Sequence, residues 1–564
     1  MNYPTFLKKV DALTAHCDAE SLRLFIHEYA RTLEEEKRAR FLLLLGDFSD
    51  VPDPAPHHSS QADDLDRRVD DILQALKEIQ DGERELDSEY NERWNDWDDD
   101  EEEDEYEFSD PYDLLDDVKR AYDLMHECLD KEKYEKGLEL AKTLSQLEIQ
   151  ISGDYNDYDE SFGIGDLLYH HLLRIDLDQC VNESLYLAYM GSKDPAETMV
   201  SILDAYDHYS VSLDDILRLG PKEIDLEKLL PGWIEALARR PAEAIDDLLI
   251  EAHNMLQDNG QILEYASRYA TSHPSLYLNI LQGEKMDKAT LMMVGLKAMQ
   301  EVPVEHQTRS TIALLTAQYA FEQEDEQTRE KCWLEAFRTS PNVANYFRLR
   351  IIGRDWDEIS GTVRDIYETY YFVKRSWDQK PLAALMFFDG RIDEMQNRFM
   401  MTKEGIGWSS TFMKEGIALL LLLLNRGQEQ GPGMKAMLSK AVSACSNNRG
   451  DYRMGTGMPD VEDTKDLFED CFQRWKEDTT VSESESDTWI RKITGWIALR
   501  VSAIMDANRR NYYGECASFV AALGEALESR GQAGAKESIM QGYRQKYSRR
   551  RAFHEELRRY GMGS

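Results

Sequence analysis

Apolar residues recur three and four positions apart along most of this 564-residue chain, which is the spacing of one face of an α-helix. The pattern predicts two or three short helices between residues 4 and 46 and a charged helix over Asp63–Glu85. Residues 113–151 predict two helices in hairpin order. The inner face expected for the second of these comprises Tyr134, Leu138, Leu140, Ala141 and Leu144.

Helical segments then recur about every 12 to 20 residues as far as Pro381, separated by proline and glycine. The segment Arg309–Pro341 comes nearest to a tetratricopeptide hairpin, because Ala317, Trp333 and Ala336 give small, aromatic and small positions before its closing proline. Arg329 departs from this pattern, since helix packing favours a small side chain there. With no run of alternating strands apparent, the sequence predicts an all-α fold, an α-solenoid of degenerate tetratricopeptide-like hairpins.

Composition shifts divide the chain into four parts. Residues 1–50 are expected to form an N-terminal helical cap. Residues 51–110 are expected to hold a proline-rich linker, the charged helix and a disordered acidic loop. Residues 111–390 form the predicted helical-repeat region, and residues 391–564 a C-terminal helical region with a basic end.

The acidic loop is the segment Asp96–Glu107, DWDDDEEEDEYE, in which charges of one sign are too dense for a compact form. We expect this segment to be dispensable for folding. Aromatic residues flank or interrupt it, so that it is either a solvated linker or a partner-binding motif. These aromatic residues are Trp94, Trp97, Tyr106 and Phe108.

The charge balance of 108 acidic against 66 basic residues, −42 overall, argues against a general nucleic-acid coat, which needs a basic footprint. Such acidity serves solubility or, alternatively, mimicry of DNA. The 42% hydrophobic content is too high for a disordered chain. Most of the chain is therefore expected to fold.

The C-terminus has the opposite sign, with 14 Lys or Arg against 7 Asp or Glu in residues 491–564, a net charge of +7. Phe553, Leu557 and Tyr560 form a helical stripe, which predicts docking of the last helix on the body of the protein rather than a free nucleic-acid arm. Five arginines would then form a basic rim for an anion or a partner. They are Arg549, Arg550, Arg551, Arg558 and Arg559.

Motifs for chemistry are weak throughout. The seven cysteines include no CxC or CxxC pair, and adjacent helical histidines such as His170 and His171 face about 100° apart, so that no metal site is predicted. The acidic turn Asp154–Asp159 lacks the glycine and glutamate of a calcium loop. No phosphate-binding loop or hydrolase motif occurs either, and no cofactor or catalytic residue is predicted.

Targeting signals are equally sparse. The first residues carry no apolar stretch typical of a secretory signal, and the apolar run Ile417–Leu424 is far shorter than the roughly 20 residues that span a bilayer. We expect a cytoplasmic protein without a membrane contact.

Two stretches resemble a known family. WLEAFRTSPNVANYFRLR (Trp333–Arg350) with RDWDEI after it, and NYYGECASFVAALGEALESRG (Asn511–Gly531) with YRQKYSRRRAFHEELRRYG after it, resemble the tetratricopeptide-like helical regions that accompany SWIM zinc fingers in bacterial proteins. A SWIM finger needs a CxC followed by a CxH, and this chain has no CxC. The resemblance therefore implies the helical part without the finger, and no zinc ligand is carried over.

A non-catalytic helical-repeat scaffold or adaptor that binds a protein partner is the function that these features favour. An accessory protein of a nucleic-acid-associated system, contacting anions through the basic C-terminus, is the alternative. An enzyme of unrecognised type comes third, because catalytic groups need not lie close in sequence.

Overall fold

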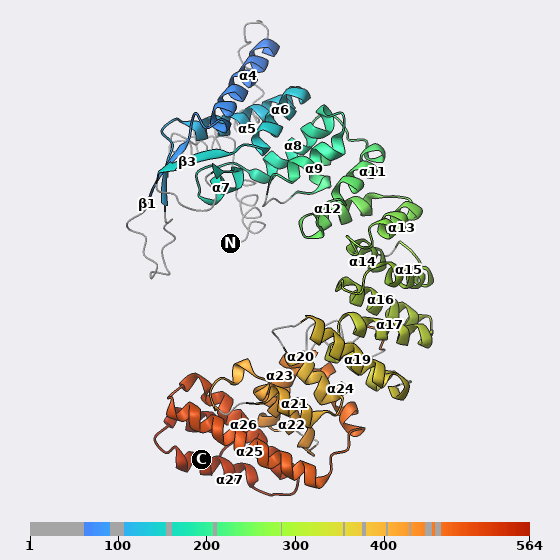
Figure 1. Ribbon diagram of the computed structural model, residues 1–564, viewed down its shortest axis with the longest axis vertical. Helices are drawn as coiled ribbons and strands as arrows, with labels where there is room; N and C mark the ends of the chain where they lie inside the picture. The colour runs from blue at the N-terminus through green and yellow to red at the C-terminus, as the bar shows by residue number, and fades with distance from the viewer. Residues whose placement is uncertain are drawn as a thin grey trace, which may run out of the picture. The chain divides into compact units, whose positions relative to one another are not determined.

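The computed structural model describes residues 61–90, 106–153, 161–206, 211–283, 285–353, 356–374, 379–401, 404–427, 430–445, 454–456 and 464–563 (Figure 1). The chain divides into two compact units, residues 1–74 and 75–564. The expected N-terminal cap and the proline-rich linker lie outside the described residues, as do Trp94, Trp97 and the turn Asp154–Asp159.

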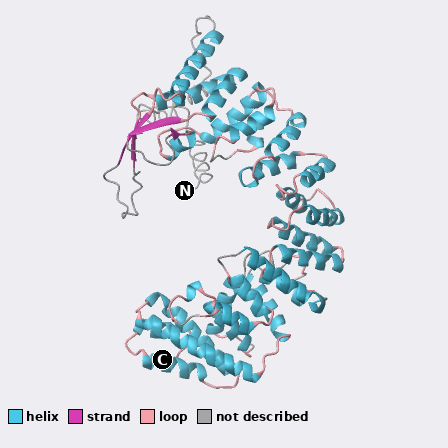
Figure 2. Ribbon diagram, viewed as in Figure 1, coloured by secondary structure: helices cyan, strands magenta, loops and turns pink. Residues whose placement is uncertain are grey.

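The fold is all-α, as the sequence predicts, and Figure 2 shows strands in a single region. The helices up to the middle of the chain are α4 (Gln61–Gln80), α5 (Leu114–Asp130), α6 (Tyr134–Ser145), α7 (Ile164–Tyr169), α8 (Leu177–Gly191), α9 (Pro195–Leu203), α10 (Leu213–Leu217), α11 (Leu226–Leu237), α12 (Ala242–Met255), α13 (Asn259–Arg268), α14 (Ser275–Gln282) and α15 (Lys288–Glu301). Those that follow are α16 (Thr308–Glu322), α17 (Glu326–Thr339), α18 (Val343–Phe347), the π-helical turn η1 (Arg348–Ile352), α19 (Trp356–Lys374), α20 (Lys380–Phe388), α21 (Ile392–Phe399), the 3-10 turn η2 (Trp408–Ser410), α22 (Met413–Leu424), α23 (Pro432–Cys445), α24 (Thr464–Glu477), α25 (Glu483–Asp506), the 3-10 turn η4 (Arg510–Tyr512), α26 (Tyr513–Ser529), α27 (Ala535–Lys546) and α28 (Arg551–Arg559).

Helices close in sequence pack on one another through residues 111–390. Helix α5 contacts α6, α8 contacts α9, α11 contacts α12, and α14, α15, α16 and α17 follow in the same manner. The predicted inner face of α6 is confirmed, because all five of its apolar residues are buried. Each amphipathic helix therefore covers its apolar face with a neighbour in the chain.

The predicted hairpin at Arg309–Pro341 is formed by α16 and α17. Ala317, Trp333 and Ala336 are fully buried between the helices. Arg329 is accommodated despite its size, because its guanidinium lies 4.8 Å from the centre of the Trp333 ring and covers that ring. A cation over an indole face is favourable, so Arg329 packs against the hairpin at the position where a small residue was expected.

A small sheet corrects the expectation of an irregular acidic loop up to Glu107. Strands β1 (Leu86–Tyr90) and β2 (Tyr106–Ser109) pair antiparallel, β1 pairs parallel with β3 (Ile149–Gly153), and β3 pairs antiparallel with β4 (Ser161–Phe162). Residues 106 and 107 thus belong to a strand, whereas the acidic residues before them lie outside the described parts of the chain. Strands of two to five residues alternate too briefly to be recognised from the sequence.

The C-terminal region is built around α26, which contacts α22, α23, α25, α27 and α28. Buried residues lie on every side of α26, from Tyr513 to Ala526, and also along α22 from Ile417 to Leu424. A helix that is apolar all round belongs in a core. The apolar run that the sequence singles out is therefore a central core helix, and no described helix is long and apolar enough to cross a membrane.

Candidate functional site

A groove with a largely apolar lining runs along α19. It lies between α19, the end of α17 and the turn that joins α15 to α16, and its volume is about 460 Å³. Thr362, Ile366, Thr369 and Val373 line its α19 wall. The spacing of these residues, four, three and four positions, places them within one narrow stripe of the helix.

A second stripe holds α19 in place. Val363 and Tyr367 are buried, and the Tyr371 hydroxyl donates a hydrogen bond to the carbonyl oxygen of Pro341 at 2.9 Å. The hydroxyl of Tyr367 donates to the carboxylate of Asp389 at 2.9 Å, and burial raises the pKa of this tyrosine well above its ordinary value. At 100° per residue, the buried stripe and the groove stripe lie about 130° apart around the helix. Packing of the first therefore leaves the second uncovered.

The opposite wall is fixed by a clamped carboxylate on α17. Glu335 pairs with Arg309 at 2.5 Å and with Arg338, a lining residue, at 3.0 Å. Because Glu335 and Arg309 are largely buried, this pair holds the wall in one position. The groove is accordingly formed before any partner arrives.

Exposed apolar side chains mark the groove as an unusual surface. Val373 is 71% exposed and Val304, on the opposite wall, 38%, while Phe372 beside the groove is 82% exposed. Two exposed carboxylates at the rim, Glu305 and Asp365, make no hydrogen bond or ion pair within the described parts of the chain. The groove thus combines apolar side chains with two unpaired carboxylates, beside Arg338, which pairs with Glu335.

The predicted docking of the last helix is confirmed. Phe553 and Leu557 are fully buried, and the Phe553 ring lies 5.7 Å from that of Tyr513 at the start of α26. Tyr560, the third residue of the stripe, is half-buried.

Two of the five C-terminal arginines have partners within the protein. Arg550 donates hydrogen bonds to the carbonyl oxygen of Met505 at 2.7 Å and to Asn508, and Arg559 pairs with Glu556 at 2.7 Å. The other three, Arg549, Arg551 and Arg558, are exposed and make no ion pair within the described residues. Three of the five predicted contacts thus remain available to an anion.

Two of the four aromatic residues beside the acidic segment lie within the described parts of the chain. Tyr106 and Phe108 lie in β2, where the Phe108 ring contacts Phe162 at 5.2 Å and His170 at 5.0 Å between ring centres. Phe108 thus contributes to an internal aromatic cluster. His170 stacks on Phe162 in the same cluster, while the adjacent His171 is exposed, which agrees with the expectation that the two face different ways.

Candidate metal ligands and thiols are spread out in the part of the chain that is described. No cluster of three or more His, Cys, Asp or Glu able to hold a metal is found there. The six described cysteines are free thiols, and burial raises the pKa of Cys332, Cys471 and Cys516 to about 12. A thiol that stays protonated at neutral pH is a poor nucleophile.

The α19 groove is the feature that sequence reasoning missed. Its signal was present, because α19 carries apolar residues on two stripes and a single packing face explains only one of them. Comparison with models of protein families, with curated proteins and with solved structures finds no match for this chain.

Proposed function

We propose that this protein is a non-catalytic helical-repeat scaffold of the cytoplasm that binds a protein partner in the α19 groove. In this proposal the repeat region is an α-solenoid of tetratricopeptide-like hairpins, in keeping with the resemblance of Trp333–Arg350 to the helical regions that accompany SWIM zinc fingers. One observation carries the proposal, namely that α19 packs through Val363, Tyr367 and Tyr371 while Val373 in the groove and Phe372 beside it stay exposed. Exposed apolar surface rimmed by polar residues is typical of protein interaction sites.

The partner segment is expected to carry apolar side chains followed by lysine or arginine. Its apolar residues would cover Ile366 and Val373, and its cationic residues would meet the free carboxylates of Glu305 and Asp365. The cost of binding is reduced because the walls are already held by Tyr371 and by the clamp on Glu335.

Affinity capture from the native host tests the proposal with a pair of matched variants. Val373→Asp places a third carboxylate in the groove, whereas Met293→Asp alters an equally exposed apolar residue on α15, outside the groove. Both side chains are more than 60% exposed, so neither change should affect folding. We expect a stoichiometric protein partner with the wild type and Met293→Asp, and its loss by more than about tenfold with Val373→Asp. Equal recovery with all three proteins would refute the groove as the binding site.

The exposed arginines favour a second candidate, an accessory protein of a nucleic-acid system. Arg549, Arg551 and Arg558 offer cations without a partner among the described residues, on an otherwise acidic chain. Recovery of nucleic acid that falls steeply with salt, and that is lost when these three arginines become alanine, would support this function in place of the first.

A further inference from the structure

A second recess lies where α20 begins, α21 ends and η2 leads into α22, and it shares no described lining residue with the α19 groove. Its volume is about 550 Å³. Lys380 and Arg398 are its charged lining residues, and Ser409, Ser410 and Thr411 contribute adjacent hydroxyl groups. No carboxylate occurs among its described lining residues, although the chain has 108 acidic residues. The lining of this α20–α22 recess is thus suited to an anion.

Hydrogen bonds hold the walls of the α20–α22 recess together. The backbone N–H of Phe412 donates to the carbonyl oxygen of Phe399 at 3.2 Å, which joins the start of α22 to the end of α21. Lys380 donates to the carboxylate of Glu415 on α22 at 2.8 Å. The side chain of Glu415 is only 13% exposed, so this ion pair fixes the start of α20 against α22. The recess is therefore formed before a ligand arrives.

Arg398 brings a cation that no carboxylate balances. The residue is exposed and makes no hydrogen bond or ion pair within the described parts of the chain. Its guanidinium group lies 5.0 Å from the centre of the Phe399 ring. A guanidinium group that rests on an aromatic face keeps its N–H groups free for two oxygens of an anion.

Further positive charge lies behind Ser409. Lys414 donates to the hydroxyl oxygen of Ser409 at 3.4 Å and pairs with Glu515 at 2.8 Å. Arg500, whose side chain is only 3% exposed, pairs with the same carboxylate at 2.8 Å. Glu515 therefore has two cationic partners. Because Ser409 accepts from Lys414, its own O–H is without an acceptor among the described residues and can donate into the recess.

The charge around the α20–α22 recess matches that of a phosphate group. These contacts bring together four cations and two carboxylates, so that two positive charges are in excess on a chain whose net charge is −42. A phosphate monoester carries a charge of about −1.5 to −2 at pH 7 and offers three acceptor oxygens, whereas a carboxylate carries a single charge. The first turn of α22, which no described side chain caps, adds backbone N–H groups that also favour an anion.

Apolar side chains form the rest of the lining. Phe399 and Phe412 line the recess, and Met401 beside them is 67% exposed. A methionine side chain adapts its shape to an apolar surface that covers it, and burial of such a surface is favourable. The organic part of the ligand is therefore expected to be apolar.

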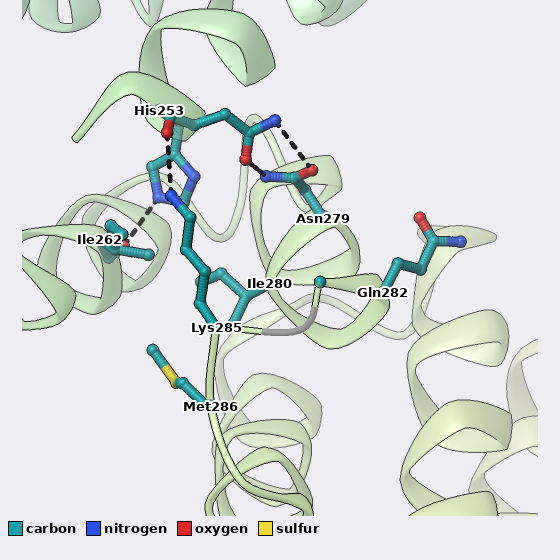
Figure 3. Close-up of a pocket in the computed structure, with 9 residues that line it drawn as sticks. His253, Ile262, Asn279, Ile280, Gln282, Lys285 and Met286 are labelled. Carbon is teal, nitrogen blue, oxygen red and sulfur yellow. Dashed lines mark hydrogen bonds between the residues drawn. The ribbon is translucent and has the colours of Figure 1, made fainter. Parts of the chain in front are cut away.

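Lys285, which lines a recess at the ends of α12 and α14, provides a contrast (Figure 3). Its Nζ donates to the backbone carbonyl oxygens of Asn254 at 2.9 Å and of Leu256 at 3.5 Å. The side-chain amides of Asn254 and Asn279 pair with one another beside it. These polar groups have partners within the protein, whereas Arg398 has none among the described residues.

We propose that the α20–α22 recess binds a small aromatic phosphate monoester. The phosphate oxygens accept hydrogen bonds from Arg398, Lys380 and the hydroxyl group of Ser409. The aromatic ring packs against Met401 and Phe412. This ligand site is additional to the partner groove on α19.

Calorimetric titration of the full chain with phenyl phosphate tests the proposal, and three further probes isolate its groups. Phenol lacks the phosphate, inorganic phosphate lacks the ring, and benzoate combines a ring with a single charge. We expect phenyl phosphate to bind at one site with a dissociation constant in the millimolar range or below, and each of the other probes to bind at least about tenfold more weakly. Absence of phenyl phosphate binding at about 10 mM, or equal affinity for any of the other three, would overturn the proposal.

A phosphotyrosine peptide distinguishes the two sources of an aryl phosphate. The peptide Gly-Gly-phosphotyrosine-Gly-Gly should bind no more tightly than phenyl phosphate, because the proposed contacts involve only the phosphate and the ring. Tighter binding of the peptide would indicate a phosphorylated protein as the ligand and overturn the assignment to a small molecule.

Matched arginine variants locate the site. Arg398→Met removes the unpaired guanidinium group from the recess, whereas Arg120→Met does the same on α5, where Arg120 is likewise exposed and without a partner in the described parts of the chain. We expect about a tenfold or greater loss of affinity for phenyl phosphate with Arg398→Met only. Equal affinity in both variants would place binding elsewhere and overturn the assignment, and the outcome of partner capture with Val373→Asp does not depend on either result.

Discussion

Glu525 on α26 holds the C-terminal region together, and its replacement by alanine gives a prediction with a defined size. Its carboxylate accepts hydrogen bonds from the backbone N–H groups of Gly433 at 3.0 Å and Met434 at 2.7 Å, at the start of α23, and from Lys536 on α27 at 2.7 Å. The side chain is only 9% exposed. One carboxylate thus joins three helices and satisfies two amides that the first turn of a helix leaves without a partner.

Removal of this carboxylate leaves Lys536, itself 16% exposed, without its counter-ion. Breaking a buried ion pair by loss of one partner costs about 3–5 kcal/mol. Hydrogen exchange measured on peptides of α23, α26 and α27 is a suitable assay, because a chain of this length is not expected to unfold in one step. At about 1.4 kcal/mol for each factor of ten, exchange in α23 should accelerate at least about a hundredfold if the opening is local.

Glu483→Ala is the matched control. Glu483, like Glu525, pairs with cationic side chains, here Arg426 and Arg530, but its own side chain is 66% exposed. Exposed ion pairs contribute little to stability, so the control should leave exchange in the three helices nearly unchanged. If Glu525→Ala behaves like the control, the carboxylate does not join these helices in the way described.

Three further outcomes are expected. Phe553→Ala, at a fully buried position of α28, should cost about 3–5 kcal/mol and expose the C-terminus to limited proteolysis, and an unchanged digestion pattern would show that α28 is not docked. His126 lies 2.8 Å from the buried carboxylate of Glu183. Burial lowers the pKa of His126, but Glu183 and the neighbouring carboxylates raise it by more, so that the pKa lies above its ordinary value of 6.5. The ion pair therefore contributes its full stabilisation below pH 6.5 and loses it as the pH rises through the pKa of His126 in the folded state. The melting temperature should fall over this pH range in the wild type and fall less in His126→Gln. Parallel curves of melting temperature against pH would contradict the pairing. Glu107 faces Glu89 across the β1–β2 pair, and Glu107→Lys should stabilise the hairpin by about 0.2–1 kcal/mol, seen as slower hydrogen exchange in both strands rather than faster.

The helices could be predicted from the sequence because the apolar residues of each buried face lie within a single helix. The inner face of α6 and the burial of Phe553 follow from spacing alone. Pro231, which the sequence suggests as a break, lies inside α11, because packing of Trp233 and its neighbours outweighs the local cost of proline. The spacing of apolar residues therefore predicts which face of a helix is buried better than it predicts where the helix begins and ends.

The sheet and the α19 groove depend on residues far apart in the chain. Leu86 pairs with Ile151, 65 positions later, and no local signal predicts such a partner. The stripe Thr362–Val373 was visible as excess apolar residues on α19, but only the packing of Tyr367 and Tyr371 shows which stripe stays exposed.

The most direct test of the partner groove is a photo-crosslinking amino acid placed at position 373 and, in a second protein, at position 293. Both positions are well exposed, so each probe can react with whatever lies against it. The proposed function predicts one dominant protein adduct from position 373 in the native host and none of that adduct from position 293. The same adduct in equal yield from both positions, or none from position 373 while a partner is still captured, would contradict binding in the α19 groove.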